Sequence, residues 1–173
     1  MQKHRFRNSA GFGKRIEYSI IARMLKEGMD VYVPLVDDNG IDAVVRREDG
    51  SFVEVQIKAR SKDVNPGDEA LFAGIRHEKR QNYWFVFYAE GVRRREGDAE
   101  PKPIMWVLSS YEFIQESYCN KKGKNVGLRT IWFNGRKQGV SYAKAQYEKY
   151  IVENLSDRIL KEDPNAQGSV SSS

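Results

Sequence analysis

The stretch GIDAVVRREDGSFVEVQIK, residues 40–58, contains two strand-like segments separated by a turn. Ile41–Arg47 and Phe52–Lys58 are rich in β-branched residues, which favour extended backbone. The Asp49-Gly50 pair between them tolerates the positive φ angles of a tight turn. The stretch therefore predicts two neighbouring antiparallel strands.

The flanking segments extend this hairpin into a larger α/β arrangement. Gly13–Gly28 carries apolar residues at helical spacing, and Val31–Val36 reads as a strand that meets the hairpin across Asn39-Gly40. Beyond the hairpin we expect three more strands, over Tyr83–Ala89, Ile104–Leu108 and Leu128–Phe133. We also expect three helices: a short one over Glu69–Arg80, a short one opened by the capping box Ser109-Ser110-Tyr111-Glu112, and a terminal one over Ser141–Lys161. The prediction is an α/β fold whose mixed central β-sheet is flanked by helices, in the core order αβββαβ.

Length and composition set the class of protein. The chain has 173 residues, a net charge of +5 and 40% hydrophobic residues, which suits one domain over 1–162, with a core at 13–89 and an extension at 90–162. Residues 163–173 have the Pro, Gly and Ser content of a disordered tail. Cys119 alone excludes a disulfide framework or a cysteine-rich zinc site. No apolar run spans a bilayer and no secretory signal begins the chain, so we expect a cytoplasmic protein without a membrane partner.

Positive charge gathers in separate parts of the chain. Its excess lies mainly in residues 1–16 and 119–149, and the candidate contacts there are Lys3, Arg5, Arg7, Lys14 and Arg15, and then Lys121, Lys122 and Lys124. Such clusters neutralise nucleic-acid phosphates and release counterions. The alternative is an ordinary solvated surface, because Lys and Arg also serve that purpose.

Polar residues in the first third of the chain are candidates for chemistry. Glu17 falls inside the apolar arc of its helix, where a carboxylate is costly unless a cation meets it. The alternative is that the first turn rotates outward and Glu17 only favours the helix dipole. Asp42 begins a strand, and Glu54, Gln56 and Lys58 share one face of the next, a pattern that a half-exposed sheet also produces.

The order of these features resembles the PD-(D/E)XK, or restriction-endonuclease-like, nuclease superfamily. The matching residues are Gly40-Ile41-Asp42, then Phe52–Lys58, with Glu17 as the helix carboxylate, and the likeness covers residues 13–89. The chain looks most similar to the resolvase-like and small restriction-like branches. In those branches Gly-Ile-Asp replaces Pro-Asp, and Gln-x-Lys can replace Glu-x-Lys.

This resemblance implies a metal-dependent endonuclease that hydrolyses phosphodiester bonds, with DNA expected rather than RNA. It implies a catalytic set of Glu17, Asp42, Gln56 and Lys58, and Mg²⁺, or Mn²⁺ in its place, held by Asp42, Gln56, the main-chain carbonyl of Ile57 and Glu17. Lys58 would orient or deprotonate the attacking water. Arg60 follows on the same strand face and is expected to contact phosphate.

Gln56 departs from the acidic residue that most of the superfamily carries at this position. An amide oxygen ligates a hard cation but brings no charge, so we expect weaker metal binding. The alternatives are a catalytically inactive nucleic-acid-binding module of the same fold, or the nuclease subunit of a larger defence or repair assembly. By analogy with small superfamily members, a homodimer is also expected.

Overall fold

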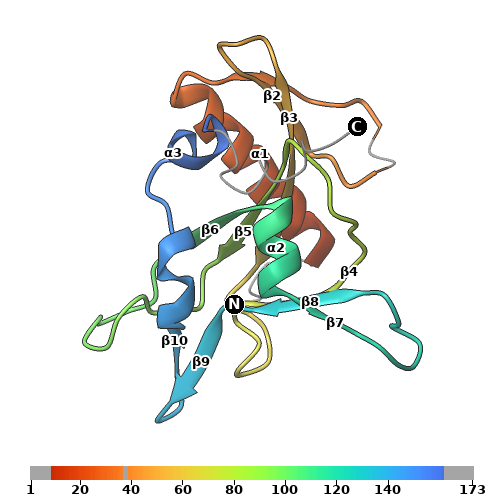
Figure 1. Cartoon of the computed structure of the whole chain (residues 1–173). Coiled ribbons are helices and arrows are strands. Elements are labelled where there is room, and N and C mark those ends of the chain that lie inside the picture. The colour runs from red at the N-terminus through yellow and green to blue at the C-terminus, as the bar shows by residue number, and fades with distance from the viewer. Residues whose placement is uncertain (1–8, 37–38, 162–173) are drawn as a thin grey trace.

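A five-stranded sheet forms the centre of the computed structural model, which describes residues 9–36 and 39–161 (Figure 1). In spatial order its strands are β1 (Asp30–Tyr32), β2 (Ala43–Arg46), β3 (Phe52–Arg60), β5 (Tyr83–Ala89) and β6 (Ile104–Ser109). Helix α1 (Ser9–Lys26) precedes the sheet. This arrangement confirms the predicted α/β class with a mixed central sheet. The tail predicted for residues 163–173 lies outside the described residues.

The first three strands form the antiparallel meander that the sequence predicts. At the turn between β2 and β3 the Arg47 amide donates to the Ser51 carbonyl at 2.8 Å, and Gly50 adopts a φ of +82°. Strand β3 then runs parallel to β5, which is antiparallel to β6. The parallel β3–β5 pair is what makes the sheet mixed.

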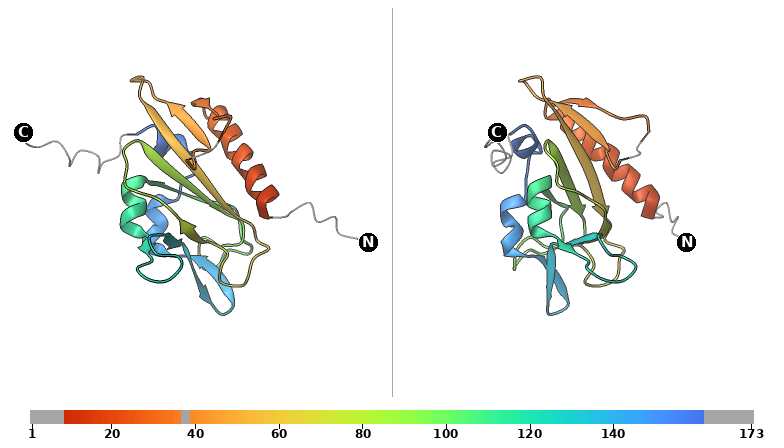
Figure 2. Two further views of the ribbon diagram at one scale, coloured as in Figure 1. Left: turned by 90° about the vertical axis from the view of Figure 1, so that its right-hand side faces the viewer. Right: turned by 45° about the vertical axis from the view of Figure 1, so that its right-hand side comes forward.

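Helix α1 covers one face of the sheet, as Figure 2 shows. Ile20, Ile21 and Met24 recur at helical spacing and are buried against the inward side chains of β3. Those side chains are Val53, Val55 and Ile57. Ile159 of the short helix α3 (Ser156–Ile159), and Leu155 directly before that helix, belong to the same core cluster.

Aromatic side chains fill the core on the other face. Phe85 and Phe87 of β5 contact Phe113 of helix α2 (Ser110–Glu116), with ring centroids 4.4 and 5.8 Å apart. The predicted capping box is present, because the Ser109 hydroxyl accepts from the Glu112 amide while the Glu112 carboxylate accepts from the Ser109 amide. Strand β5 is thus buried on both faces, as its apolar sequence predicts.

The helix predicted over Glu69–Arg80 is wrong. This crossover instead contains strand β4 (Leu71–Ile75), which pairs with β8 (Arg129–Trp132), and β8 pairs with β7 (Tyr118–Cys119). Phe72 and Ile75 enter the aromatic core, and Gly74 has a φ of +74°, which a helix does not allow. Pairing with a distant strand therefore overrides the local helix propensity.

The single terminal helix predicted over Ser141–Lys161 is also wrong. The segment contains strand β10 (Val140–Ala143), the 3₁₀ helix η1 (Ala145–Tyr150) and α3. Strand β10 forms a hairpin with β9 (Asn134–Lys137), closed by positive φ angles at Gln138 and Gly139.

No helix in the described part of the chain is long and apolar enough to cross a membrane.

Candidate active site

Asp42 lies beside β3 at the point where β2 begins. The Ile57 amide donates to Asp42 Oδ2 at 2.6 Å, and the Asp42 amide donates to the Val55 carbonyl at 2.9 Å. The amide and carbonyl of one strand residue point to the same side of the strand, so the Ile57 carbonyl also points to the β2 side of β3. The hairpin thus directs a carboxylate and a main-chain carbonyl to the same edge of β3.

Gln56 packs against Gly40, two residues before Asp42. A β-carbon added to Gly40 would lie 2.2 Å from Gln56 Nε2, so the side-chain amide occupies the space that the glycine leaves. Gly40 has a φ of +69°, and its carbonyl accepts a hydrogen bond of 2.9 Å from the Tyr83 hydroxyl. Gln56 is buried, and it is therefore held at the same end of the hairpin as Asp42.

Glu17 lies on α1 and is linked to Asp42 through Lys14, which pairs with Glu17 and also feels the charge of Asp42. The Glu17 side chain is 13% exposed, and its carboxylate contacts the Lys14 ammonium at 2.7 Å. This hydrogen bond raises the pKa of Lys14 above its usual value, and the charge of Asp42 contributes to the rise. Lys14, predicted to bind nucleic acid, is therefore the local counterion of Glu17 and feels the charge of Asp42.

Lys58 follows Ile57 on β3 and is half-buried. Its ammonium makes no hydrogen bond or ion pair with other residues in the described part of the chain. Glu54, on the same strand face, instead forms an ion pair with Arg80 at 3.2 Å. Within the described part of the chain, the Lys58 ammonium thus keeps its hydrogen-bond donors available, whereas the Glu54 carboxylate is paired with Arg80.

The donor set around Asp42 fits a hard divalent cation. Carboxylate, amide and main-chain oxygens are the ligands that Mg²⁺ accepts, and a lysine ammonium already lies against one of the two acids. Among residues 9–36 and 39–161, no three His, Cys, Asp or Glu side chains gather as a metal site. Asp42 is thus joined by the Ile57 main chain, whereas Glu17 lies on α1, and Gln56 alternates with the residues of β3 that face that helix.

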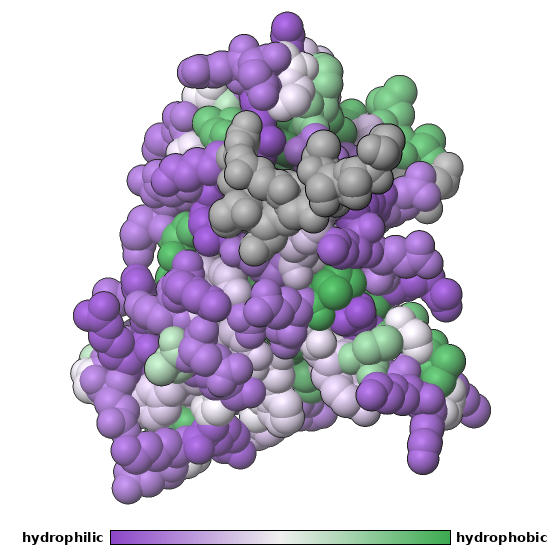
Figure 3. Space-filling view, in the orientation of Figure 1, coloured by the Kyte–Doolittle hydropathy of each residue, from purple (hydrophilic) through white to green (hydrophobic). Residues whose placement is uncertain are grey.

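The basic residues predicted to contact nucleic acid fall into three groups. Lys3, Arg5 and Arg7 lie outside the described residues. Arg60 extends β3, but its guanidinium donates to the Leu71 carbonyl at 3.0 Å and lies 5.8 Å from the Phe72 ring, so it also holds β4. The exposed members are Lys14 and Arg15 on α1 and Lys121, Lys122 and Lys124 between β7 and β8. Hydrophilic residues cover most of the face seen in Figure 3.

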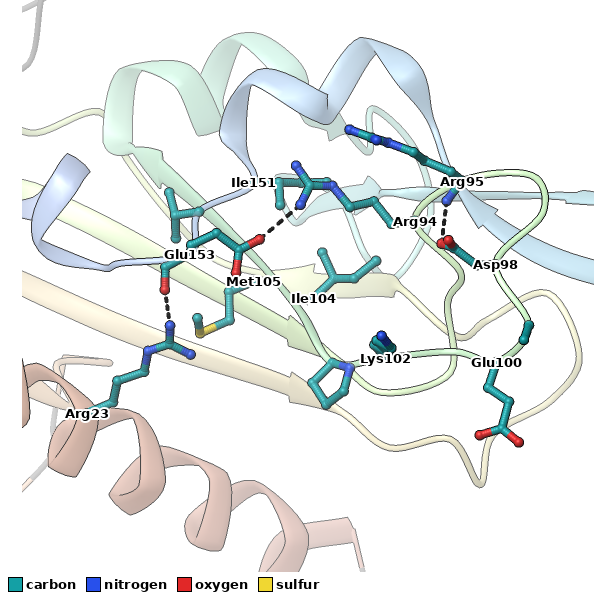
Figure 4. A pocket seen from close by; sticks show the side chains of 13 residues that line it. Arg23, Arg94, Arg95, Asp98, Glu100, Lys102, Ile104, Met105, Ile151 and Glu153 are labelled. Atoms are coloured by element: carbon teal, nitrogen blue, oxygen red, sulfur yellow. Dashed lines mark hydrogen bonds and ion pairs between the residues drawn. The ribbon is translucent and has the colours of Figure 1, made fainter.

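A separate cavity of about 550 Å³ lies beside the 91–103 loop (Figure 4). Arg94 in its wall pairs with Glu148 at 2.8 Å and with Glu153 at 3.0 Å, and Arg23 donates to the Glu153 carbonyl. Its charged groups largely neutralise one another. The cavity holds none of the residues predicted for catalysis.

Tyr83 and Gly40 take part in the contacts of the candidate site, and the sequence does not identify either residue as part of it. Burial, together with the charges of Asp42 and Glu54, raises the pKa of Tyr83 to about 12. The phenol therefore stays protonated and donates to the Gly40 carbonyl. Gly40 itself is recognisable as a turn residue, but its contact with Gln56 has no sequence signal.

The comparisons with known proteins bear on the fold. No protein-family model matches the chain, and a search of curated proteins finds no match. The structure of a bacterial homing endonuclease, I-Ssp6803I, resembles it with a TM-score of 0.52 and 19% sequence identity, over 84% of this chain and 89% of that chain. At this identity the likeness shows that the two chains share a fold.

Proposed function

We propose that this protein is a metal-dependent endonuclease that hydrolyses phosphodiester bonds in nucleic acid, DNA in preference to RNA. The observation that carries the proposal is the 2.6 Å hydrogen bond from the Ile57 amide to Asp42. This bond joins the Asp42 carboxylate to the middle residue of the Gln56-Ile57-Lys58 step, which supports a Gln-x-Lys variant of the PD-(D/E)XK site. The fold shared with a bacterial homing endonuclease supports the same class of reaction.

Asp42 and Glu17 would hold Mg²⁺ or Mn²⁺, together with the Gln56 amide oxygen and the Ile57 carbonyl. The bound ion would neutralise phosphate charge and lower the pKa of a water molecule. The Lys14 ammonium contacts Glu17 Oε1, so a metal ion bound through that oxygen would displace this ammonium. The long, mostly exposed Lys14 side chain allows this exchange.

Lys58 is proposed as the catalytic lysine because its ammonium has no partner among the described residues. Its place on β3 beside Ile57 would let it hold the attacking water and stabilise charge on the phosphate. Lysine suits this task better than arginine, because its pKa shifts more readily with its surroundings.

A nucleic-acid-binding module without catalysis is the second candidate. The neutral Gln56 favours it, since the site then offers fewer charges to a metal. The two candidates differ in a direct way: the module would bind nucleic acid in salt-dependent fashion and cleave none.

The test is a cleavage panel on supercoiled, linear and branched DNA and on RNA, with Mg²⁺, Mn²⁺ or EDTA. We expect metal-dependent cleavage that Asp42→Asn and Lys58→Ala each reduce at least hundredfold, because they remove a ligand charge and the catalytic ammonium (about 2.7 kcal/mol for each hundredfold). Asp42→Asn keeps an acceptor for the Ile57 amide, which preserves the hairpin.

Matched controls are Asp157→Asn and Lys26→Ala, which change exposed residues of α3 and α1. Both should cleave like the unmodified protein, with unchanged thermal unfolding. Cleavage that survives Asp42→Asn and Lys58→Ala would refute the site assignment. Binding without cleavage under every metal would favour the module.

A further inference from the structure

Trp132 ends β8 with 44% of its surface exposed, whereas Trp84 and Trp106 are 2% and 0% exposed. It alternates with the buried Ile131 and so points away from the aromatic core. Its ring presents a large flat surface at the boundary between the protein and solvent. Neither the metal site nor the core accounts for its position.

The indole ring is fixed by hydrogen bonds rather than loosely placed. Its Nε1 donates to the Gly67 carbonyl at 3.0 Å and to Asn134 Oδ1 at 2.9 Å. Asn134 is itself 1% exposed, and its amide nitrogen lies within hydrogen-bond distance of the Gly67 carbonyl and Ser141 Oγ. A buried, fully engaged amide thus ties the 66–70 loop to the ring and orients it.

One cation lies close to this ring, and a second borders the same cavity. The Lys144 ammonium lies 5.3 Å from the Trp132 ring centroid and donates to the Trp132 carbonyl at 2.8 Å. Trp132 borders a cavity of about 450 Å³, and Arg136 and Lys144 lie in the same wall. This volume falls within the range of small-molecule sites and suits a ligand of nucleotide size.

The geometry points to a stacking site for an unpaired nucleobase at Trp132, with Lys144 and Arg136 beside the adjoining phosphates. This inference rests on the proposed nuclease function, because it specifies which part of a nucleic acid the protein holds. The indole nitrogen already has two acceptors, so the ring offers a ligand only its π surface. Every base has a π face, and two nearby cations match the charge of the backbone.

The position of the stacking site relative to the metal site supports one continuous substrate. Gln56, Lys58 and Arg60 share a face of β3, and four residues of strand span about 13 Å. Arg60 then donates to the Leu71 carbonyl, and Leu71 is the strand partner of Trp132. Arg60 thus joins β3 to the strand pair that carries Trp132, and we expect one nucleic-acid strand to contact both sites.

The test measures binding in EDTA, where no cleavage occurs, with a single-stranded oligonucleotide, a blunt duplex and the same duplex carrying a short unpaired bulge. Tryptophan fluorescence reports on the site, since Trp84 and Trp106 are buried. We expect the single strand and the bulged duplex to quench the fluorescence, and the blunt duplex and inorganic phosphate to quench it far less.

Trp132→Ala should weaken binding of the single strand and the bulged duplex about tenfold or more, and leave the blunt duplex unaffected, because stacking is lost. Trp132→Phe should keep most of that affinity without the fluorescence change. Tyr118→Ala, which removes an exposed ring from β7 of the same small sheet, is the matched control and should bind normally. Thermal unfolding checks that each variant folds.

Equal binding of all ligands by Trp132→Ala and the unmodified protein would overturn the inference, as would equal quenching by the blunt duplex. The proposed function fails separately. Quenching that depends on Trp132, in a protein that cleaves nothing with Mg²⁺ or Mn²⁺, would leave the stacking site and remove the nuclease. Cleavage abolished by Lys58→Ala, with normal binding by Trp132→Ala, would support the nuclease and overturn the stacking site.

Discussion

Gly40 determines the local geometry of the candidate site at the residue scale. It combines a positive φ with close contact to the Gln56 amide, and its carbonyl anchors Tyr83. Few residues satisfy both demands, because a β-carbon there is strained by φ and also collides with Gln56. The Gly-Ile-Asp sequence is therefore a structural requirement as well as a resemblance.

Gly40→Ala is expected to destabilise the protein by about 1–2 kcal/mol and to displace Gln56 from the hairpin end. Cleavage should fall by more than the stability loss explains. Gly50→Ala is the matched control: Gly50 has a φ of +82° but nothing within 4 Å of an added β-carbon. Thermal unfolding and cleavage rates separate the two effects. If both variants lose activity equally, the Gln56 contact has no role.

One buried histidine, His77, lies in the segment that connects β3 to β5. His77 is 9% exposed, lies 2.7 Å from Ser110 Oγ and packs against the rings of Tyr83 and Phe85. Burial, together with the charges of Arg80 and Arg129, lowers the pKa of His77 to about 4. The imidazole is therefore neutral in the folded protein at neutral pH.

Stability is expected to fall as pH drops from about 6.5 to 4. The unfolded chain binds a proton on His77 near its ordinary pKa of about 6.5, and the folded chain binds it only near pH 4. The contribution of His77 to the free energy of unfolding is complete above pH 6.5, and about 2–3 kcal/mol of it is lost by pH 4. Denaturant unfolding of the unmodified protein and of His77→Gln measures it. A slope over pH 5–6.5 that persists in His77→Gln would contradict the assignment.

Local patterns predicted some elements and missed others for a physical reason. The meander and α1 follow from turn residues and apolar spacing within about 20 residues, which sequence displays directly. Strand β4 does not, because its partner Trp132 is far along the chain and no local signal encodes that pairing. The prediction for the terminal segment is wrong for a similar reason, because Tyr147 and Tyr150 pack into the aromatic core from a 3₁₀ helix and not from the expected α-helix.

The candidate site divides in the same way. Asp42 and the Gln56-Ile57-Lys58 step are neighbours in a hairpin, so their proximity follows from sequence once the turn is recognised. The ion pair of Lys14 with Glu17 depends on side-chain direction, and the Trp132 cavity depends on residues from the 66–70 loop and from β9. Tertiary packing alone brings these groups together.

The whole molecule is held together by contacts from its last third. Arg47 at the β2–β3 turn donates to the Ile159 carbonyl at 3.1 Å, and the Ser156 amide donates to Glu27 at 2.9 Å. Leu155 and Ile159 complete the core beneath α1. The region that resembles a nuclease core is therefore not packed independently of the remainder.

A chain that ends at Glu116 is expected to lose cooperative unfolding, because β4 loses its partner and the core loses Leu155 and Ile159. Circular dichroism and amide dispersion in NMR spectra measure this. Ile131→Ala serves as the comparison: it removes a buried side chain from β8 at a cost of about 2–4 kcal/mol but should keep a single transition. A truncated chain with a sharp transition would show that residues 9–116 fold alone.

The pairing of β4 with β8 also sets the timing of folding during synthesis. Leu71–Ile75 leaves the ribosome well before Arg129–Trp132 exists, and at about 5–20 residues per second the delay is roughly 3 to 12 s. Throughout that interval Phe72 and Ile75 lie on an unpaired strand edge beside an incomplete aromatic core. The nascent chain is most prone to aggregation in this window, and a chaperone that covers apolar strands would act on it there.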